Sequence, residues 1–172
     1  MVSVIVSRDL WREALRHLDH GAEQVGFFRA DFDRVTNQFR LLEWRPMSPD
    51  EVEYENPYHV TLTDEAKVAV LQWSSGASLV EAHSHGDLIP ARFSGSDVWG
   101  LREWVPHLFW RLARRPYAAI VTAEDGFDAL AWIDSATDPL QVEAVSFEDG
   151  AAHHATAHTM LGRYFDEKEA TS

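Results

Sequence analysis

The chain has 172 residues, of which 45% are hydrophobic and none is cysteine. This length fits one domain with its own hydrophobic core, and the lack of cysteine excludes a disulfide framework, a thiol nucleophile and thiolate metal ligands. The formal net charge of −13 argues against nucleic acid as a partner, because phosphate contacts require a basic surface. Such an acidic surface serves either solubility or the attraction of a partner with a basic face.

The first residues lack the features of a targeting signal. Residues 1–7 form an uncharged run that is too short for a secretory signal, and no apolar stretch reaches the length of a membrane span. We therefore expect a cytoplasmic protein with no membrane partner. Arginine outnumbers lysine and alanine is abundant, a composition that hints at a GC-rich bacterial genome.

The N-terminal part of the chain predicts a strand, a helix and a hairpin in that order. Residues 2–6 are rich in β-branched residues, as is typical of a strand, and Ser7 can cap the helix that follows. Two apolar runs, Gln24–Phe32 and Phe39–Trp44, favour a β-hairpin. The acidic segment from Pro46 to Pro57 is predicted to be a surface loop. The buried face of the helix is predicted to carry Trp11, Ala14, Leu15 and Leu18.

The middle of the chain predicts two helices with a strand between them. Tyr58–Leu62 is predicted as a short strand, and Thr63 as the cap of the helix that follows. Ser78–Ala82 has the composition of a buried strand and leads directly into two histidines. A further helix begins near Ser94, and Pro106 within it predicts a kink or a break. The buried face of that helix is predicted to carry Val98, Leu101, Val105, Leu108, Phe109 and Leu112.

The remaining sequence predicts three strands and then a polar tail. The strands are Tyr117–Ala123, Ala129–Asp134 and Leu140–Phe147. Residues 151–172 are polar and rich in alanine, which indicates either a short helix or partial disorder. Because strands and helices mix without strict alternation, we expect an α/β (mixed α+β) fold with a central mixed β-sheet flanked by helices.

Candidate metal ligands occur in His83-Ser84-His85 and in Ser94-Gly95-Ser96-Asp97. Residues i and i+2 of a strand point to the same face, so both imidazoles can reach one ion, although such pairs also occur on ordinary surfaces. The second segment has the spacing of a helix capping box, which alone is a structural feature. A cap at Ser94 would place Asp97 on the first helical turn, beside the strand end that holds the histidines. Three such ligands with an open position for water are typical of a catalytic zinc site.

These segments resemble a known signature. Val80-Glu81-Ala82-His83-Ser84-His85 followed by Ser94-Gly95-Ser96-Asp97 is similar to the JAMM motif of the JAB/MPN (Mov34) zinc metalloproteases. The family also carries an upstream glutamate, which Glu23 in Glu23-Gln24-Val25-Gly26-Phe27-Phe28 matches. The chain departs from the family at Gly86, where proline is usual, and its spacer before Ser94 is one residue longer. Both departures concern the loop over the site, and so substrate fit rather than metal binding.

The resemblance assigns roles to five residues. It implies that His83, His85 and Asp97 hold one Zn²⁺ per chain, that Glu23 accepts the proton of the metal-bound water, and that Ser94 stabilises the oxyanion. It also implies an MPN architecture, related to that of cytidine deaminases, with a metalloprotease domain over residues 1–150 and a tail or short helix over residues 151–172.

The resemblance further implies the substrate. Members of the family cleave the peptide or isopeptide bond after the C-terminal glycine of a ubiquitin-like protein, so the expected partners are such a protein or its conjugates. In bacteria, E1-like and E2-like proteins of the same operon, some in antiphage defence, are further expected partners. Two alternatives stay open: a peptidase that processes a sulfur-carrier protein, and a non-catalytic MPN scaffold that binds partners. The intact ligands and Glu23 argue against the scaffold.

Other histidines have weaker claims to function. His153, His154 and His158 form a loose group near the C-terminus that is a candidate second metal site. His17 and His20 flank the end of the first predicted helix, where a cation suits the negative end of the helix dipole.

Overall fold

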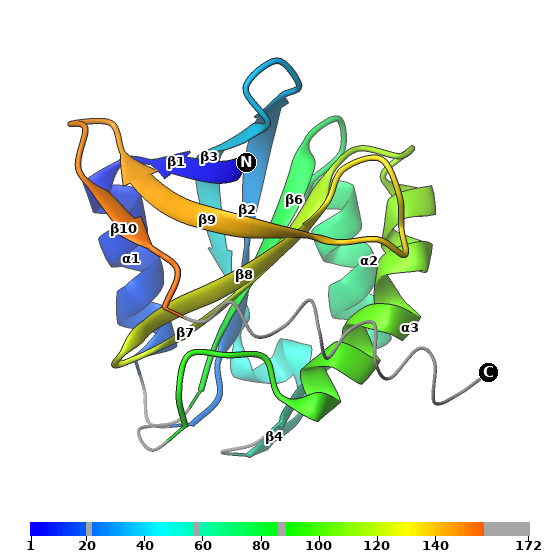
Figure 1. Ribbon diagram of the computed structural model, residues 1–172. Coiled ribbons are helices and arrows are strands. Elements are labelled where there is room, and N and C mark those ends of the chain that lie inside the picture. The colour runs from blue at the N-terminus through cyan, green and yellow to red at the C-terminus, as the bar shows by residue number, and fades with distance from the viewer. Residues whose placement is uncertain (20–21, 57–58, 86–88, 157–172) are drawn as a thin grey trace.

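A closed ring of strands forms the centre of the fold (Figure 1). The computed structural model describes residues 1–19, 22–56, 59–85 and 89–156, and within these ranges all side chains except those of residues 54–56, 59 and 60. In the described residues the ring has seven strands, in the order β1-β3-β2-β6-β7-β8-β9, and β9 pairs with β1 again. The seven strands are β1 (Val2–Val6), β2 (Val25–Asp33), β3 (Gln38–Pro46), β6 (Ser78–Ser84), β7 (Tyr117–Ala123), β8 (Gly126–Trp132) and β9 (Leu140–Phe147).

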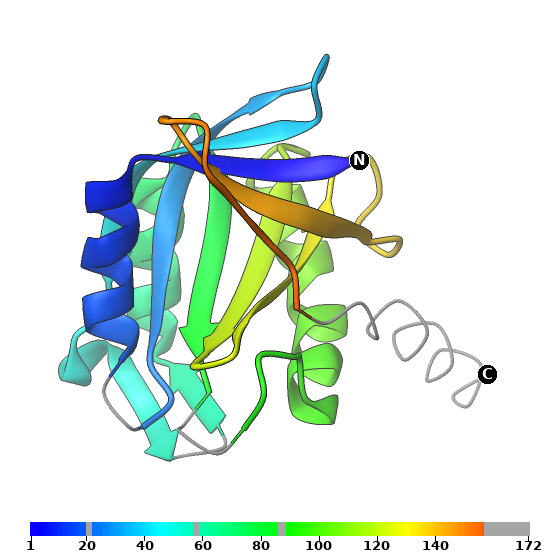
Figure 2. The ribbon, with the colours of Figure 1, turned by 60° about the vertical axis from the view of Figure 1, so that its left-hand side comes forward.

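The expected central sheet flanked by helices is therefore wrong, and so is the MPN architecture that the resemblance implied. The strand β1 runs parallel to β3 on one side, where Val4 faces Phe39, and parallel to β9 on the other, where Val4 faces Val145. Figure 2 shows β1 and β9 side by side. Strand periodicity predicts which face of a strand is buried, but it does not predict which strands pair, so the closure was not foreseen.

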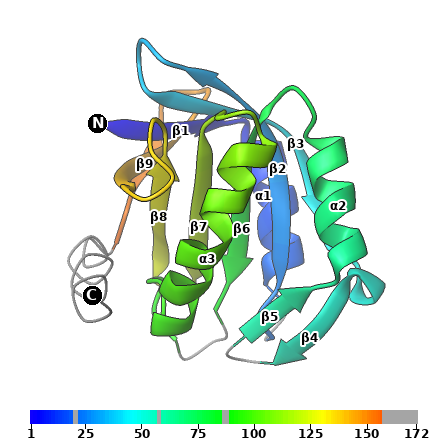
Figure 3. The same ribbon diagram turned by 90° about the vertical axis from the view of Figure 1, so that its right-hand side faces the viewer.

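In the described part of the chain, three helices pack against the outside and the open end of the ring: α1 (Arg8–Leu18), α2 (Asp64–Trp73) and α3 (Gly95–Arg111). In Figure 3, α3 lies in front of β6 and β7, and α2 lies on the other side of β2. Ser7, Thr63 and Ser94 cap the three helices as the sequence predicts, each accepting a hydrogen bond from a backbone N–H of the first turn. None of the helices in the described ranges offers an apolar stretch of membrane-spanning length.

Two hydrophobic clusters lie on opposite faces of β6, because successive strand residues point in opposite directions. Val80 and Ala82 belong to the first cluster, with Ala14 and Leu18 of α1. The second cluster contains Leu79 and is covered by α2 and α3. The predicted buried face of α3 is confirmed, whereas Leu15 of α1 is 37% exposed and was wrongly placed on a buried face.

The prediction of a surface loop from Pro46 to Pro57 is also wrong. In this segment Met47 is buried, Pro49–Glu51 forms a short 3₁₀ turn, and β4 (Val52–Asn56) pairs antiparallel with β5 (His59–Leu62). The acidic residues that suggested a loop alternate with apolar ones, which is the period of a strand. The resulting hairpin lies below α2 and α3 in Figure 3.

The predictions for the third helix and for the C-terminal tail have different outcomes. Helix α3 continues through Pro106 without the break that the sequence suggested. After β9, the strand β10 (Ala152–His154) pairs with it antiparallel. The predicted tail helix lies largely outside the described residues, as do His20 and His158, and the domain boundary at residue 150 stays a prediction.

Ring closure predicts the effect of a substitution in β1. Val4 is fully buried between its two neighbouring strands, so Val4→Ala should leave a cavity and lower the free energy of unfolding by about 1–3 kcal/mol. Val35→Ala is the matched control, because Val35 is 93% exposed in the turn between β2 and β3. Denaturant unfolding measures both, and equal stability of the two variants would contradict the structural role of β1.

Candidate metal centre

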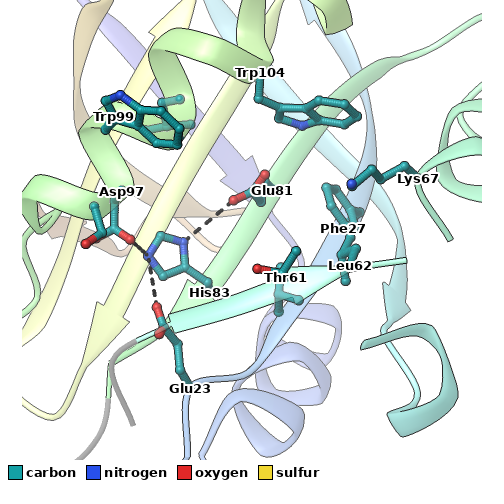
Figure 4. Close-up of a pocket in the computed structure, with 14 residues that line it drawn as sticks. Glu23, Phe27, Thr61, Leu62, Lys67, Glu81, His83, Asp97, Trp99 and Trp104 are labelled. Atoms are coloured by element: carbon teal, nitrogen blue, oxygen red, sulfur yellow. Dashed lines mark ion pairs between the residues drawn. The ribbon is translucent and has the colours of Figure 1, made fainter. Parts of the chain in front are cut away.

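Four side chains from separate parts of the chain meet at the C-terminal end of β6 (Figure 4). They are Glu23, His83, His85 and Asp97, and each offers one ligand atom. These atoms all lie within 4.8 Å of one another, and the group as a whole is buried or nearly so. The structure thus brings together the four residues that sequence analysis placed at the metal and its water, and this group could hold a metal ion.

The position of the histidines follows from the strand pairing of β6. This strand runs antiparallel to β2, where His83 faces Val25, and parallel to β7, where it faces Val121. Glu23 precedes Val25 by two residues, and so continues the same face of β2 towards His83. His85 extends the pairing beyond β6, because its backbone N–H donates to the carbonyl of Thr122 over 2.9 Å.

Ser84 points away from the cluster and has a structural role. Its hydroxyl accepts a hydrogen bond from the backbone N–H of Gln24 over 3.1 Å, and its own N–H donates to the Gln24 carbonyl over 2.9 Å. These two bonds fix the segment that carries Glu23 against the strand that carries the histidines.

The capping box of α3 holds Asp97 in place. The Asp97 N–H donates to Ser94 Oγ over 3.2 Å, and the Ser94 N–H donates to Asp97 Oδ2 over 2.5 Å. The predicted cap is therefore confirmed. The Ser94 hydroxyl accepts this bond through its oxygen, which leaves its hydrogen able to donate elsewhere. An oxyanion-stabilising role for Ser94 stays a prediction.

The spacing of the ligand atoms fits a small cation. Asp97 Oδ1 lies 3.7 Å from His83 Nε2, and Asp97 Oδ2 lies 3.2 Å from His85 Nε2. Ligands placed tetrahedrally at zinc distances are about 3.4 Å apart. His83 Nε2 is buried and has no hydrogen-bond partner, which is costly unless another species occupies the centre. The residues present therefore fit a metal.

Glu23 lies slightly farther from the histidines than Asp97 does. Its Oε1 is 4.0 Å from Nε2 of His83 and 4.0 Å from Nε2 of His85. Its side chain is only 2% exposed. This larger separation suits a carboxylate that contacts a metal-bound water rather than the metal itself.

Neighbouring charges shift the pKa values of His83 and Asp97 in opposite directions. Burial by itself lowers the pKa of His83, but the carboxylates of Asp97 and Glu81 outweigh it and raise the pKa to about 10. Burial by itself raises the pKa of Asp97, but His83, His85 and the Ser94 N–H hold that pKa far below its ordinary value. This pKa favours a proton on His83 between the carboxylates, and a cation held by the same residues would have to displace that proton.

Two further residues, not predicted from the sequence, extend the cluster from His83. Glu81 Oε1 lies 3.7 Å from His83 Nδ1, and Tyr117 donates its hydroxyl hydrogen to Glu81 Oε2 over 2.6 Å. The available signal was the spacing, because Glu81 precedes His83 by two residues on the same strand and so shares its face. Nothing local in the sequence pointed to Tyr117.

The loop that departs from the family motif is tied to the centre at its described end. The carbonyl of Pro90 lies 3.2 Å from His85 Nδ1, and the Ala91 N–H donates to Asp125 over 2.8 Å. Phe93 packs edge-on against the His83 ring. Asp125 thus anchors the loop from the turn between β7 and β8.

A cleft of about 360 Å³ opens beside the cluster, and sequence analysis did not predict it. Trp99 and Trp104 of α3 form one wall, and Leu62 of β5 lies on the other (Figure 4). Lys67 of α2 closes the far end, with its ammonium group 6.0 Å from the centre of the Trp104 ring. The cleft is thus largely apolar and leads from the cluster towards one cation.

The other histidines whose side chains the structure describes form no comparable group. His153 and His154 are exposed on β10, and the described ranges contain no second set of three or more candidate ligands. His17 Nε2 lies 3.1 Å from the carbonyl of Val25, so this side chain connects the end of α1 to β2.

Comparisons with known proteins extend only to the fold. No protein-family model matches the chain, and no curated protein matches it. The solution structure of protein DSY2949 from Desulfitobacterium hafniense, a structural genomics target, is similar with a TM-score of 0.53. The two sequences are 16% identical, and the match covers 90% of this chain and 97% of the other. At that identity, the likeness supports a shared fold alone.

The centre predicts loss of metal on removal of one ligand. His83→Ala should reduce the metal retained by the protein to a small fraction of the wild-type amount, because three protein ligands are the usual minimum. Elemental analysis after loading with a divalent metal and dialysis measures this. His153→Ala removes an exposed histidine and should leave the metal content unchanged; equal loss in both variants would contradict the site.

The pKa of His83 predicts how the metal-free protein responds to pH. Its folded value of about 10 exceeds its ordinary 6.5, so the stabilisation is fully present below pH 6.5 and is lost as the pH rises through 10. Thermal unfolding of chelator-treated protein should show this loss, with a smaller slope for His83→Ala. A pH dependence identical in both proteins would contradict the assignment.

Proposed function

We propose that the protein is a zinc-dependent peptidase with JAMM-type chemistry, which cleaves after the C-terminal glycine of a ubiquitin-like protein. The observation that carries the proposal is the convergence of two histidines, Asp97 and Glu23 on one buried centre, with Ser94 at the adjacent helix cap. Buried ligands with a nearby carboxylate base are the arrangement that metal-assisted hydrolysis requires.

The donor set favours zinc. Two imidazoles and one carboxylate, with no thiolate in the chain, suit Zn²⁺ with an open coordination position. When bound, the metal supplies a water whose pKa falls towards about 7. The intact buried donors argue against the alternative of a non-catalytic scaffold. Burying such polar groups costs folding free energy, and a scaffold that only binds partners would have no use for them.

Glu23 and Ser94 would divide the remaining chemistry. Glu23 is buried at 4.0 Å from both ligand nitrogens, where it can accept a proton from the nucleophilic water and return it to the leaving amine. Ser94 keeps a hydroxyl hydrogen that can donate to the oxygen of the attacked carbonyl. Asp97, whose oxygens lie 3.7 Å from His83 Nε2 and 3.2 Å from His85 Nε2, would complete the ligand set with the two histidines.

The cleft supports a peptide as substrate. It lies between α3 and β5, and β5 pairs only with β4 among the described strands. An extended chain can therefore lie along β5 with its reactive end at the cluster, and terminal glycines suit the approach to buried ligands. The net charge of −13 favours a partner with a basic face. A bacterial conjugation system, with E1-like and E2-like partners and a link to antiphage defence, is the proposed setting.

A cleavage assay tests the proposal. The substrates are fusions of a ubiquitin-like protein and of a sulfur-carrier protein, each extended beyond its terminal glycines. We expect Glu23→Gln to keep its zinc and to lose roughly 10²–10⁴-fold in kcat. Glu43→Gln, an exposed glutamate of β3, is the matched control. Activity that survives both Glu23→Gln and chelation would refute the proposal, and the preferred fusion separates the two substrate classes.

The cleft predicts a change in substrate binding. Trp104→Ala removes an apolar wall, so KM should rise about tenfold while kcat and zinc content change little. Trp110→Ala is the matched control on the same helix, because Trp110 is 72% exposed and does not line the cleft. Steady-state kinetics compare the two variants, and an equal effect on KM would rule out the cleft as the substrate path.

A further inference from the structure

Glu81 is a carboxylate in the middle of a buried strand, and its two oxygens have different partners. Oε1 lies 3.7 Å from His83 Nδ1, and Oε2 accepts a 2.6 Å hydrogen bond from Tyr117. The Glu81 side chain is only 17% exposed, so these two contacts largely replace contacts with solvent. Figure 4 shows Glu81 on one side of the His83 ring, with Asp97 and Glu23 on the other.

Tyr117 is well suited to hold Glu81 still. It is fully buried in β7, next to β6, and its ring packs against Trp132 at 5.7 Å. Burial and the neighbouring Glu81 carboxylate raise the pKa of Tyr117 well above its ordinary value. The phenol therefore stays protonated at ordinary pH and remains a hydrogen-bond donor.

The two histidines of the cluster share one arrangement. His85 directs Nδ1 to the carbonyl of Pro90 at 3.2 Å, and a carbonyl can only accept a hydrogen bond. His83 Nδ1 lies 3.7 Å from Glu81 Oε1, so both rings place Nδ1 beside an acceptor and turn Nε2 towards the centre. A neutral imidazole carries one N–H, and an acceptor beside one nitrogen favours the N–H there. The other nitrogen then has the free lone pair that binds a metal.

We infer that Glu81 is a positioning residue for His83. Glu81 accepts the Nδ1–H of His83 and so keeps His83 Nε2 directed at the metal, and Tyr117 influences metal binding only by holding Glu81. The inference rests on the metal centre of the proposed function, but not on the peptide chemistry. Of the two acceptors beside the histidine Nδ1 atoms, a side-chain substitution can remove only Glu81, because the acceptor beside His85 is the backbone carbonyl of Pro90.

Zinc affinity, measured by competition with a chromophoric chelator, tests the inference. Glu81→Gln should weaken zinc binding about 10–100-fold, the usual effect of losing a hydrogen-bond partner of a metal-ligating histidine. Tyr117→Phe should cause a smaller loss in the same direction. The double variant should bind zinc no more weakly than Glu81→Gln alone, because Tyr117 has no separate route to the metal. Asp128→Asn, a buried carboxylate of β8 bonded to Gln141, is the matched control and should leave the affinity unchanged.

A second readout separates positioning from general loss of structure. In the zinc-loaded wild type, the Nδ1 proton of His83 should give a downfield NMR resonance, which Glu81→Gln should shift upfield at an unchanged melting temperature. Unchanged zinc affinity in Glu81→Gln, or additive losses in the double variant, would overturn the inference. Glu81-dependent zinc binding without any cleavage would instead refute the proposed function alone. Cleavage with full zinc affinity in Glu81→Gln would refute the positioning role alone.

Discussion

The pairing of β6 between β2 and β7 is the constraint on which the candidate centre depends. Antiparallel pairing with β2 brings the segment of Glu23 alongside His83, and parallel pairing with β7 carries the backbone on to His85. Ser84 lies between the histidines and points to the opposite face, where its hydroxyl accepts a hydrogen bond from the Gln24 N–H and so strengthens the contact with the segment of Glu23. The helix cap at Ser94 then needs only to add Asp97. Backbone hydrogen bonds, rather than the ligands themselves, hold the ligand set together.

The centre combines burial with opposed charge, an arrangement that a protein core ordinarily avoids. Three carboxylates surround His83 within 4.0 Å, and all of the side chains concerned are largely buried. Each desolvated charge carries a cost that its partners offset only in part. Such a cost is typical of sites where preorganised charge serves binding or chemistry. The surrounding clusters of apolar residues on both faces of β6 supply the stability that this centre does not.

Local patterns predicted that His83, His85 and Asp97 would converge, whereas Glu23 was predicted only from the family resemblance and the closed ring was not predicted at all. The spacing of His83, His85, Ser94 and Asp97 is local, and strand and helix geometry translate it directly into directions. Ring closure depends on β1 meeting β9, a contact between residues such as Val4 and Val145 that no local period encodes. The cleft walls and Tyr117 were missed for the same reason, since they reach the centre from distant elements.

The double pairing of β1 also bears on the order in which the molecule is completed. The four candidate ligands lie between Glu23 and Asp97, whereas the last strand of the ring, β9, begins at Leu140. During synthesis from the N-terminus, every ligand is therefore made before the ring can close. Contacts as distant as that between β1 and β9 form slowly, because a long loop must be ordered first. The four ligands are thus available while β1 can pair with β3 but not yet with β9.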